Sequence, residues 1–313
     1  MPFKSVPQKY AASIKEVTIG AGDKTVTFGG ESVAPLYSFD DPIKNPPKVG
    51  IEISDKGPDL TLPELAKFYA GCKTIPEFAK KACTAKGASF ISLFFESADP
   101  NGDNTSIDDC VKLAKEVAAV VTLPLVIQGC KNEEKDGDLF NKIAEALSGN
   151  CLLIAAKESN HKKIAVGAVT AYKAKIGAES AVDINLAKQL NVVITQAGVG
   201  LENVVMNVGQ CAAGYGFEYL VSTLDRIKAA ALAQSDAQLQ IPIITPAGQE
   251  AWNVKEAVAA EADAPKGWGP AEQRGINMEI CTASSLIAAG SNAVILRHPK
   301  SIETISGLVA ALV

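Results

Sequence analysis

The side chains best suited to binding a ligand are short alcohols and amides, with one carboxylate and one tryptophan. The seven candidates for binding a cofactor are Asp99, Gln128, Ser180, Asn207, Gln210, Thr245 and Trp252. Amides and hydroxyls can both donate and accept hydrogen bonds, so this set suits a polar, uncharged ligand. We assign no residue a catalytic or metal-binding role, because the set is poor in strong acids and bases.

Strongly reactive side chains are few in this chain, which has only two histidines. His298, between Arg297 and Pro299, is expected to have a structural role at a strand end, and His161 is expected in the first turn of an exposed helix. Lys157 is the one lysine near a strand end that could form a Schiff base, but it stands in a charged loop. The sequence therefore disfavours an aldolase and a histidine–carboxylate metal enzyme.

The cysteines are scattered. Zinc and iron–sulfur sites usually draw at least two ligands from one short motif, whereas no two cysteines here lie within ten residues of each other. We expect all seven to be small buried hydrophobes in a reducing compartment: Cys72, Cys83, Cys110, Cys130, Cys151, Cys211 and Cys281.

The candidate residues need a scaffold that brings distant strand ends together. Eight short apolar runs alternate with stretches of helical periodicity, and we expect strands at Val49–Ile53, Phe90–Phe95, Leu125–Gln128, Cys151–Ala155, Lys175–Glu179, Val204–Val208, Ile241–Thr245 and Ala293–Arg297. The runs Ile164–Val169 and Val192–Thr195 resemble strands in composition, but we place both in helices. Thr74 and Glu77 form a capping box that begins one helix.

This alternation predicts a (β/α)8 TIM barrel, in which the strand C-termini and the loops after them form the working face. A doubly wound sheet is the rival fold, and it usually has a glycine-rich first turn. The segment Ser54–Pro58 has one glycine. The barrel is therefore favoured.

The chain divides into two expected parts, residues 1–47 and the barrel at 48–313. Ile14–Ile19 and Thr25–Phe28 alternate apolar and polar residues around a glycine-containing turn, which predicts a β-hairpin followed by an irregular link. We expect the hairpin to cover the bottom of the barrel, opposite the mouth. The long loop 246–270 holds both tryptophans, Trp252 and Trp268, and is expected to be either a lid or interface or an anchor on the barrel top.

The composition limits the possible partners. The formal net charge is −5, from 30 basic and 35 acidic residues, and the absence of a long basic run disfavours nucleic acid. The first residues lack the apolar core of a signal peptide, and no apolar stretch is long enough to span a membrane. We expect a cytoplasmic location.

Several stretches, in order along residues 48–300, resemble the small subunit of corrinoid iron–sulfur proteins, which is the acetyl-CoA decarbonylase/synthase delta-subunit family. They are Glu96–Pro100, Gly129-Cys130, Asp183–Asn191, Gly214–Tyr219, Glu250–Trp252, Gly267–Gly269, Arg274–Ile276 and Arg297–Pro299. Each stretch alone is weak, but their order and spacing are specific.

The resemblance implies a heterodimer with a large subunit that carries a [4Fe–4S] cluster and a cobamide, a B12-type corrinoid. The barrel mouth of the small subunit would cover one face of the corrinoid. A methyltetrahydrofolate methyltransferase would supply the methyl group, and acetyl-CoA synthase would receive it in the reductive acetyl-CoA (Wood–Ljungdahl) pathway. The cluster would lie in the partner and not in this chain, which agrees with the scattered cysteines.

Two features bear on this implication. No Asp-x-His-x-x-Gly motif occurs, so this chain is not expected to supply a histidine to cobalt. Family members are expected to have Asp-Pro after the sixth strand, where this chain has Asn207-Val208-Gly209-Gln210. The alternatives are a pterin-binding methyltetrahydrofolate–corrinoid methyltransferase, with Asp99, Asn101 and Asn207 on the pterin, and a barrel that acts only as a scaffold.

Overall fold

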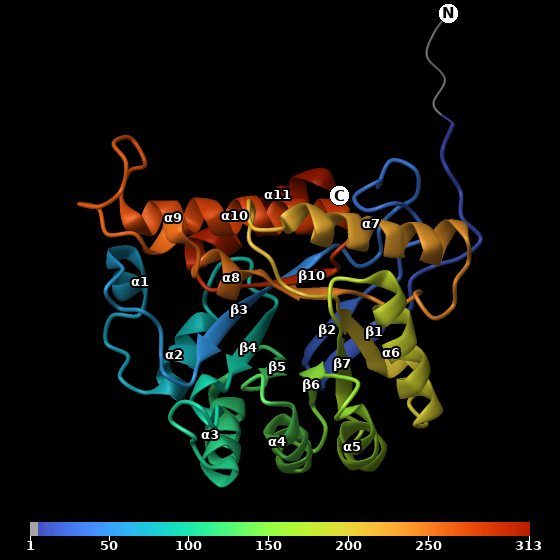
Figure 1. Ribbon diagram of the computed structural model, residues 1–313, viewed down its shortest axis with the longest axis horizontal. Coiled ribbons are helices and arrows are strands. Elements are labelled where there is room, and N and C mark those ends of the chain that lie inside the picture. The colour runs from blue at the N-terminus through green and yellow to red at the C-terminus, as the bar shows by residue number, and fades with distance from the viewer. Residues whose placement is uncertain (1–5) are drawn as a thin grey trace, which may run out of the picture.

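A computed structural model, which describes residues 6–313, shows a barrel of parallel strands (Figure 1). Within those residues the main sheet has eight strands in the order β8-β7-β6-β5-β4-β3-β10-β9. A single bridge between Met206 and Ile243 brings the two end strands together. The TIM-barrel prediction is confirmed. The strands are β3 (Lys48–Ser54), β4 (Phe90–Phe94), β5 (Leu125–Gln128), β6 (Cys151–Ala156), β7 (Lys175–Glu179), β8 (Val204–Asn207), β9 (Ile244–Pro246) and β10 (Ala293–Leu296).

The helices surround the barrel and follow the strands in the expected alternation. They are α1 (Pro63–Phe68), α2 (Ile75–Ala82), α3 (Ile107–Val120), α4 (Glu133–Ala146), α5 (His161–Ile164), α6 (Ile184–Gln196), α7 (Phe217–Ala233), α8 (Ala247–Ala251), α9 (Lys255–Val258), α10 (Ala271–Ala289) and α11 (Pro299–Leu312). The short helical turns are η1 (Glu96–Ala98), the π-helical η2 (Ala165–Thr170) and η3 (Leu201–Asn203).

The local signals in the sequence act as expected. Thr74 caps α2 in a reciprocal capping box with Glu77. The run 164–169 lies in α5 and η2, and the run 192–195 lies in α6, so both helical assignments are confirmed. None of the helices in residues 6–313 is both long and apolar enough to cross a membrane.

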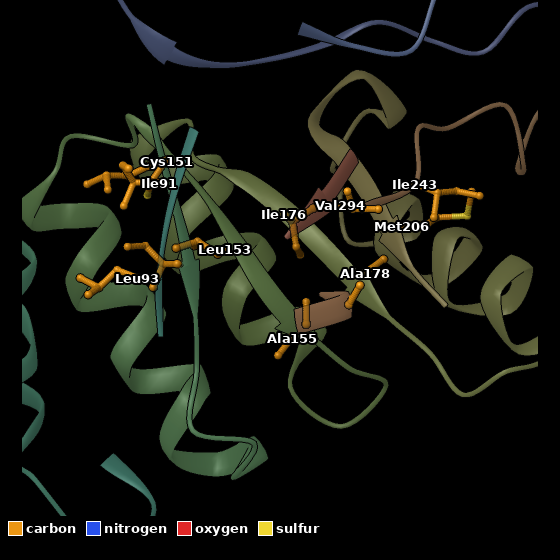
Figure 2. Packing of buried hydrophobic residues seen from close by; sticks show 14 of the residues in the cluster. Ile91, Leu93, Cys151, Leu153, Ala155, Ile176, Ala178, Met206, Ile243 and Val294 are labelled. Carbon is orange, nitrogen blue, oxygen red and sulfur yellow. The ribbon is translucent and has the colours of Figure 1, made fainter. Parts of the chain in front are cut away.

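Side chains alternate between the two faces of the barrel wall, because successive residues of a strand point to opposite faces. One set packs outward against the helices, and Figure 2 shows part of this layer, including Ile91, Leu93, Leu153 and Ile176. The other set, which includes Phe90, Val126 and Val205, fills the interior. Gly50 leaves room there, since a β-carbon at this position would collide with the Phe90 ring.

The hairpin β1 (Val17–Ala21) and β2 (Lys24–Phe28) covers the end of the barrel where the strands begin. Val17 and Phe28 pair across the hairpin, and the Phe28 ring meets the Phe90 ring edge-on at 5.7 Å. Four hairpin side chains belong to the interior cluster of the barrel: Val17, Ile19, Val26 and Phe28. The hairpin is therefore a plug opposite the mouth, as its sequence position suggested.

Candidate functional site

A buried carboxylate lies at the centre of the barrel mouth. Glu52 on β3 has a side chain that is 2% exposed, and it accepts a hydrogen bond from Arg297 Nε at 2.7 Å. Its other oxygen accepts from the amide groups of Gln128 at 2.7 Å and Gln249 at 2.8 Å. Gln128 also donates to Ser92 Oγ at 2.8 Å and accepts from Gln249 at 3.0 Å. Five elements are thereby tied together by one network: β3, β4, β5, α8 and the end of β10.

The network is a consequence of strand alternation. Ile51 and Ile53 point outward into the helix layer, so Glu52 between them must point into the barrel. A charge in that position is tolerated only when it is paired and hydrogen-bonded. The Arg297 guanidinium supplies the opposite charge, and the two amides fill the remaining oxygen. Both oxygens of Glu52 and the carbonyl oxygen of Gln128 accept hydrogen bonds, which makes the network a rigid floor for the mouth.

The residues that follow β10 form part of the rim of the barrel mouth, and hydrogen bonds fix their position. His298 Nδ1 accepts the backbone N–H of Lys300 at 3.1 Å and so caps α11. Its Nε2 then carries the proton and donates to Glu272 at 3.2 Å. Burial lowers the pKa of His298, although Glu272 opposes the shift. The structural role expected for His298 is confirmed.

Two more buried carboxylates hold the neighbouring segments. Glu272 accepts the backbone N–H groups of Glu64 and Leu65, which fixes the start of α1. Glu279, fully buried, accepts the backbone N–H groups of Arg297 at 2.5 Å and His298 at 3.2 Å. Burial raises the pKa of Glu279.

The rim loops after β3 and β5 are fixed in the same way. Asp136 is 1% exposed and accepts the N–H groups of Cys130 at 2.8 Å and Lys131 at 3.0 Å. Asp55 accepts the backbone N–H and the hydroxyl of Ser97. Burial raises the pKa of both carboxyls. The rim loops are thus set before any ligand binds.

A wide groove of about 690 Å3 opens over the ends of β6 and β7 and continues along α6. Its polar side includes Lys157, whose Nζ lies 3.5 Å from Glu179 and 3.8 Å from Glu133, and Ser180. The opposite side is apolar and is formed by Leu186, Leu190 and Val193 of α6. Lys157 lies between carboxylates, which agrees with its predicted place in a charged loop.

Strand β6 has an unusual backbone conformation just before its end. Ala155 has a φ of 102° at a bulge in the pairing of β6 with β7. His161 is buried, at 5% exposure, and its Nδ1 contacts the Glu158 carbonyl at 2.7 Å. His161 is the first residue of α5, as predicted, but the expected exposure is wrong for its side chain, because the imidazole turns back onto its own loop instead of pointing to solvent.

Two of the seven predicted site residues, Ser180 and Asn207, lie beside each other at the ends of β7 and β8, and Gln210 follows in the loop after β8. The Ser180 backbone N–H donates to the Asn207 carbonyl at 2.9 Å. Asn207 is fully buried, donates to Glu179 at 3.4 Å and accepts the Gly209 N–H at 3.2 Å. Gln210 lines a smaller cavity of about 250 Å3 beside Cys211 and Val254. Its Oε1 is buried and has no hydrogen-bond partner within residues 6–313.

The other four predicted residues are dispersed. Gln128 is 4% exposed and its amide is taken up by the Glu52 network. Asp99 accepts the backbone N–H of Asn101 in a local turn of its loop. Trp252 stacks on His298 with ring centroids 5.9 Å apart. No single site of the described chain collects all seven.

Thr245 does not lie at the mouth, and the structure corrects this expectation. The predicted strand ended at Thr245, whereas β9 begins at Ile244. Since Ile244 points into the barrel, Thr245 points outward, where its hydroxyl bonds Ser291 at 2.9 Å and is wholly buried.

The cysteines form no cluster in the part of the chain that the structure describes, where no group of three or more potential ligands lies close enough to hold a metal ion. Cys110, Cys130 and Cys151 are buried as expected, but the expectation is wrong for the other four, since Cys281 is exposed and the rest are only partly buried: Cys72, Cys83 and Cys211. Burial raises the pKa of the Cys130 thiol to about 12, so it is a poor nucleophile at neutral pH.

The comparisons with known proteins decide the family. A family model described as CO dehydrogenase/acetyl-CoA synthase delta subunit matches residues 16–305. This chain belongs to that family. The resemblance found in the sequence is thereby confirmed.

Archaeal delta subunits of the acetyl-CoA decarbonylase/synthase complex align with nearly the whole chain. The protein from Archaeoglobus fulgidus is 29% identical over 97% of this chain and 69% of its own length. The protein from Methanocaldococcus jannaschii is 32% identical over 95% of this chain and 74% of its own length.

Solved structures with the same fold include two dihydropteroate synthases. The enzyme from Xanthomonas albilineans has a TM-score of 0.58 at 12% identity, over 95% of this chain and 98% of its own. The enzyme from Yersinia pestis has a TM-score of 0.56 at 12% identity, over 86% of this chain and 95% of its own. At this identity the likeness concerns the barrel fold alone.

Proposed function

We propose that this chain is a subunit of a methyl-carrying complex of acetyl-CoA metabolism, and that its barrel mouth covers one face of a corrinoid held by a larger partner subunit. The partner would carry the cobamide and a [4Fe–4S] cluster. A methyltetrahydrofolate methyltransferase would be the donor enzyme, and acetyl-CoA synthase would be the acceptor. Membership of the delta-subunit family over residues 16–305 is the observation that carries the proposal.

The size and the lining of the groove over β6 and β7 fit a large flat ligand. One side presents the Ser180 hydroxyl next to the charged Lys157 and Glu179, and the other presents the apolar face of α6. A corrinoid needs an apolar surface and polar groups, because its macrocycle is apolar and flat while its edge carries amide side chains. The groove is also open, with Leu186 on α6 45% exposed, which suits a ligand shared with a second subunit.

An unpaired acceptor tests the fit of the residues to such a ligand. Gln210 Oε1 is buried without a partner in the described part of the chain, and an unmet acceptor of this kind is costly unless something donates to it. The N–H groups of an amide side chain would do so once the Gln210 side chain turned toward the ligand, because its Oε1 has almost no exposed surface in the present arrangement. Ser180 and Gln189 in the groove, with Gln210 next to it, are the residues that would hold the corrinoid edge.

The bound corrinoid would carry the methyl group on cobalt. The chain's own part is to hold the edge of the macrocycle and to shield its face. Both oxygens of Glu52 below the mouth accept hydrogen bonds from side chains of this chain, so this carboxylate serves to hold the barrel elements together. This arrangement supports a carrier subunit in preference to the pterin-binding methyltransferase.

Purification from the native source tests the proposal. The tagged chain should co-purify with a partner that contains cobalt and iron, and corrinoid should appear in an amount equal to that of the complex. A chain that purifies with neither cobalt nor a partner would contradict it. Methylation of free cobalamin by the isolated chain with methyltetrahydrofolate would instead favour the methyltransferase.

Variants of the mouth test its contact with the corrinoid. Ser180→Ala and Gln210→Ala should each lower the methyl-transfer rate of the complex about two- to tenfold, because one hydrogen bond contributes about 0.5–1.5 kcal/mol. Ser285→Ala is the matched control, since its hydroxyl bonds the Cys281 carbonyl on the outer helix α10. An equal effect of all three variants would argue against corrinoid contact at the mouth.

A further inference from the structure

Loop 209–216, between β8 and α7, carries Gln210 and has a backbone that packing alone does not fix. Gly209, Gly214 and Gly216 have positive φ angles of 102°, 86° and 74°, a region that glycine enters at little cost. A β-carbon on Gly214 would meet no atom within 4 Å, so the loop has free space beside this residue. The position of the loop must therefore come from specific contacts.

The contacts that hold this loop lead to α10 and to residues 252–270, which include α9 and are called here the α9 segment. The Ala213 N–H donates to Thr282 Oγ1 on α10 at 3.1 Å. The Tyr215 hydroxyl donates to the Glu256 carboxylate in the α9 segment at 2.6 Å. The loop also shares a small apolar cluster with the α9 segment and α10, which consists of Ala212, Val254, Ala257 and Met278. The position of the loop thus depends on the position of its neighbours.

Arg274, in the first turn of α10, holds the α9 segment together. Its side chain is buried, and the residue is 6% exposed. Its Nε donates to the Glu256 carbonyl at 2.7 Å, its Nη1 to the Gly269 carbonyl at 2.5 Å, and its Nη2 to the Ala259 carbonyl. A buried charge is tolerated only when it is hydrogen-bonded, and here backbone carbonyls supply the acceptors. The planar guanidinium therefore ties the two limbs of the α9 segment to each other.

Glu256 connects the α9 segment to loop 209–216. Its backbone carbonyl accepts from Arg274 at 2.7 Å, and its carboxylate accepts from the Tyr215 hydroxyl at 2.6 Å. One residue is thus bonded to Arg274 through its main chain and to the neighbouring loop through its side chain. A shift of the backbone at Glu256 would carry the carboxylate away from Tyr215. The arginine on α10 and the loop after β8 are therefore linked although they do not bond each other directly.

We infer that Arg274 is a positioning residue of the barrel mouth: it fixes Glu256, and through Glu256 and Tyr215 it holds the loop that carries Gln210. Loop 209–216 and the α9 segment then behave as one unit. The unit keeps Gln210 beside the groove over β6 and β7, where its side chain can turn toward a ligand. This last step rests on the proposed function, which makes Gln210 a contact of the corrinoid edge. The coupling of the two loops does not depend on it.

Hydrogen–deuterium exchange of the full-length chain, at millisecond to second times, tests the coupling. Arg274→Gln removes most of the bonds to the three carbonyls, so it should speed exchange about tenfold or more in both the α9 segment and loop 209–216. Arg226→Gln is the matched control, because Arg226 is exposed on α7, and it should leave both segments unchanged. Faster exchange in the α9 segment alone would overturn the inference. An equal rise throughout the chain, with the hairpin at residues 17–28 included, would also overturn it, because Arg274 would then be a general stabilising residue.

Variants of the connecting bond test the same coupling without disturbing the buried arginine. Tyr215 is 47% exposed, so Tyr215→Phe should fold normally. It should speed exchange in loop 209–216 about two- to tenfold, through the loss of one hydrogen bond, and leave the α9 segment unchanged. Glu256→Ala should act like Tyr215→Phe, whereas Glu256→Gln keeps an acceptor and should have a smaller effect. Equal effects of Glu256→Gln and Glu256→Ala on the loop would overturn the inference.

The methyl-transfer rate of the complex tests the step that involves the corrinoid. If Tyr215 acts through Gln210, the double variant Tyr215→Phe with Gln210→Ala should transfer methyl groups at the same rate as Gln210→Ala alone. A double variant in which the two single effects multiply would overturn action through Gln210. If neither single variant changes the rate, the corrinoid proposal fails for this loop, whereas coupled exchange of the two loops would still support the positioning role of Arg274.

Discussion

Replacement of Arg297 by methionine should destabilise the barrel through the carboxylate that it leaves unpaired. Removing one partner of a fully buried pair costs about 3–5 kcal/mol. Glu52 is buried, with a side chain 2% exposed, but Arg297 is 30% exposed, so water can reach the carboxylate of the variant. We therefore expect a loss of about 2–3 kcal/mol. For a chain of this length that is a fall in Tm of roughly 3–5 °C.

The double variant Glu52→Gln with Arg297→Met isolates the electrostatic part. A neutral glutamine can still accept from Gln128 or Gln249, so the double variant should recover about 1–2 kcal/mol relative to Arg297→Met. Thermal unfolding followed by circular dichroism measures both. Lys86→Met, which removes the exposed pair with Glu303, should leave Tm unchanged. The reasoning is refuted if Arg297→Met has the same Tm as the wild type, or if the double variant is less stable than Arg297→Met.

Three further outcomes are expected. Lys228→Met should lower stability by about 3–5 kcal/mol, because Lys228 is 3% exposed and Glu31 is 8% exposed. Burial by itself would raise the pKa of Glu31, but the charge of Lys228 and the hydrogen bonds from Lys228 and Asn292 together hold that pKa below its ordinary value. The stabilisation by this pair is therefore complete at pH values above the ordinary pKa of a glutamate, and it is lost as the pH falls through the lowered pKa of Glu31 in the folded chain. Below neutral pH, the stability of the variant should therefore fall less steeply with decreasing pH than the stability of the wild type. Ala155→Gly should raise stability by about 1 kcal/mol, since a φ of 102° favours glycine. Ala156→Gly, the control, should lower it. If urea unfolding shows that both variants change the free energy of unfolding in the same direction, this expectation is contradicted. Deletion of residues 1–30 should lower Tm and leave the corrinoid contact of any surviving complex intact, and a lost contact at unchanged Tm would show that the hairpin lies at the wrong end.

The barrel could be predicted because its signals are local. Short apolar runs marked every strand, and capping residues marked the starts of the helices between them. The predicted bounds of β5 and β7 agree with the observed ones to the residue. The helical assignment of 164–169 followed from topology and not from composition, which favours a strand there. Which residues face the mouth could be predicted only where the end of the strand was placed correctly. The predicted strand ended at Thr245, but β9 extends to Pro246, and Thr245 faces outward instead of into the mouth.

The polar floor was only partly predictable. Gln128 was expected as a ligand contact, but its amide serves Glu52, which the sequence interpretation passed over. The signal was present in Val49–Ile53, where one acidic residue lies at an inward position of an otherwise apolar strand. The inward turn of the His161 side chain depends on tertiary packing, which no local pattern encodes.

Hydrogen–deuterium exchange of the chain, alone and in complex with its corrinoid-carrying partner, tests the central claim most directly. The account predicts corrinoid-dependent protection in the loops at the strand C-termini, in residues 157–160, 180–190 and 209–216. The hairpin at residues 17–28 should exchange alike in the presence and absence of the corrinoid. Protection confined to the hairpin end, or protection that does not depend on the corrinoid, would contradict the claim that the mouth covers the cofactor.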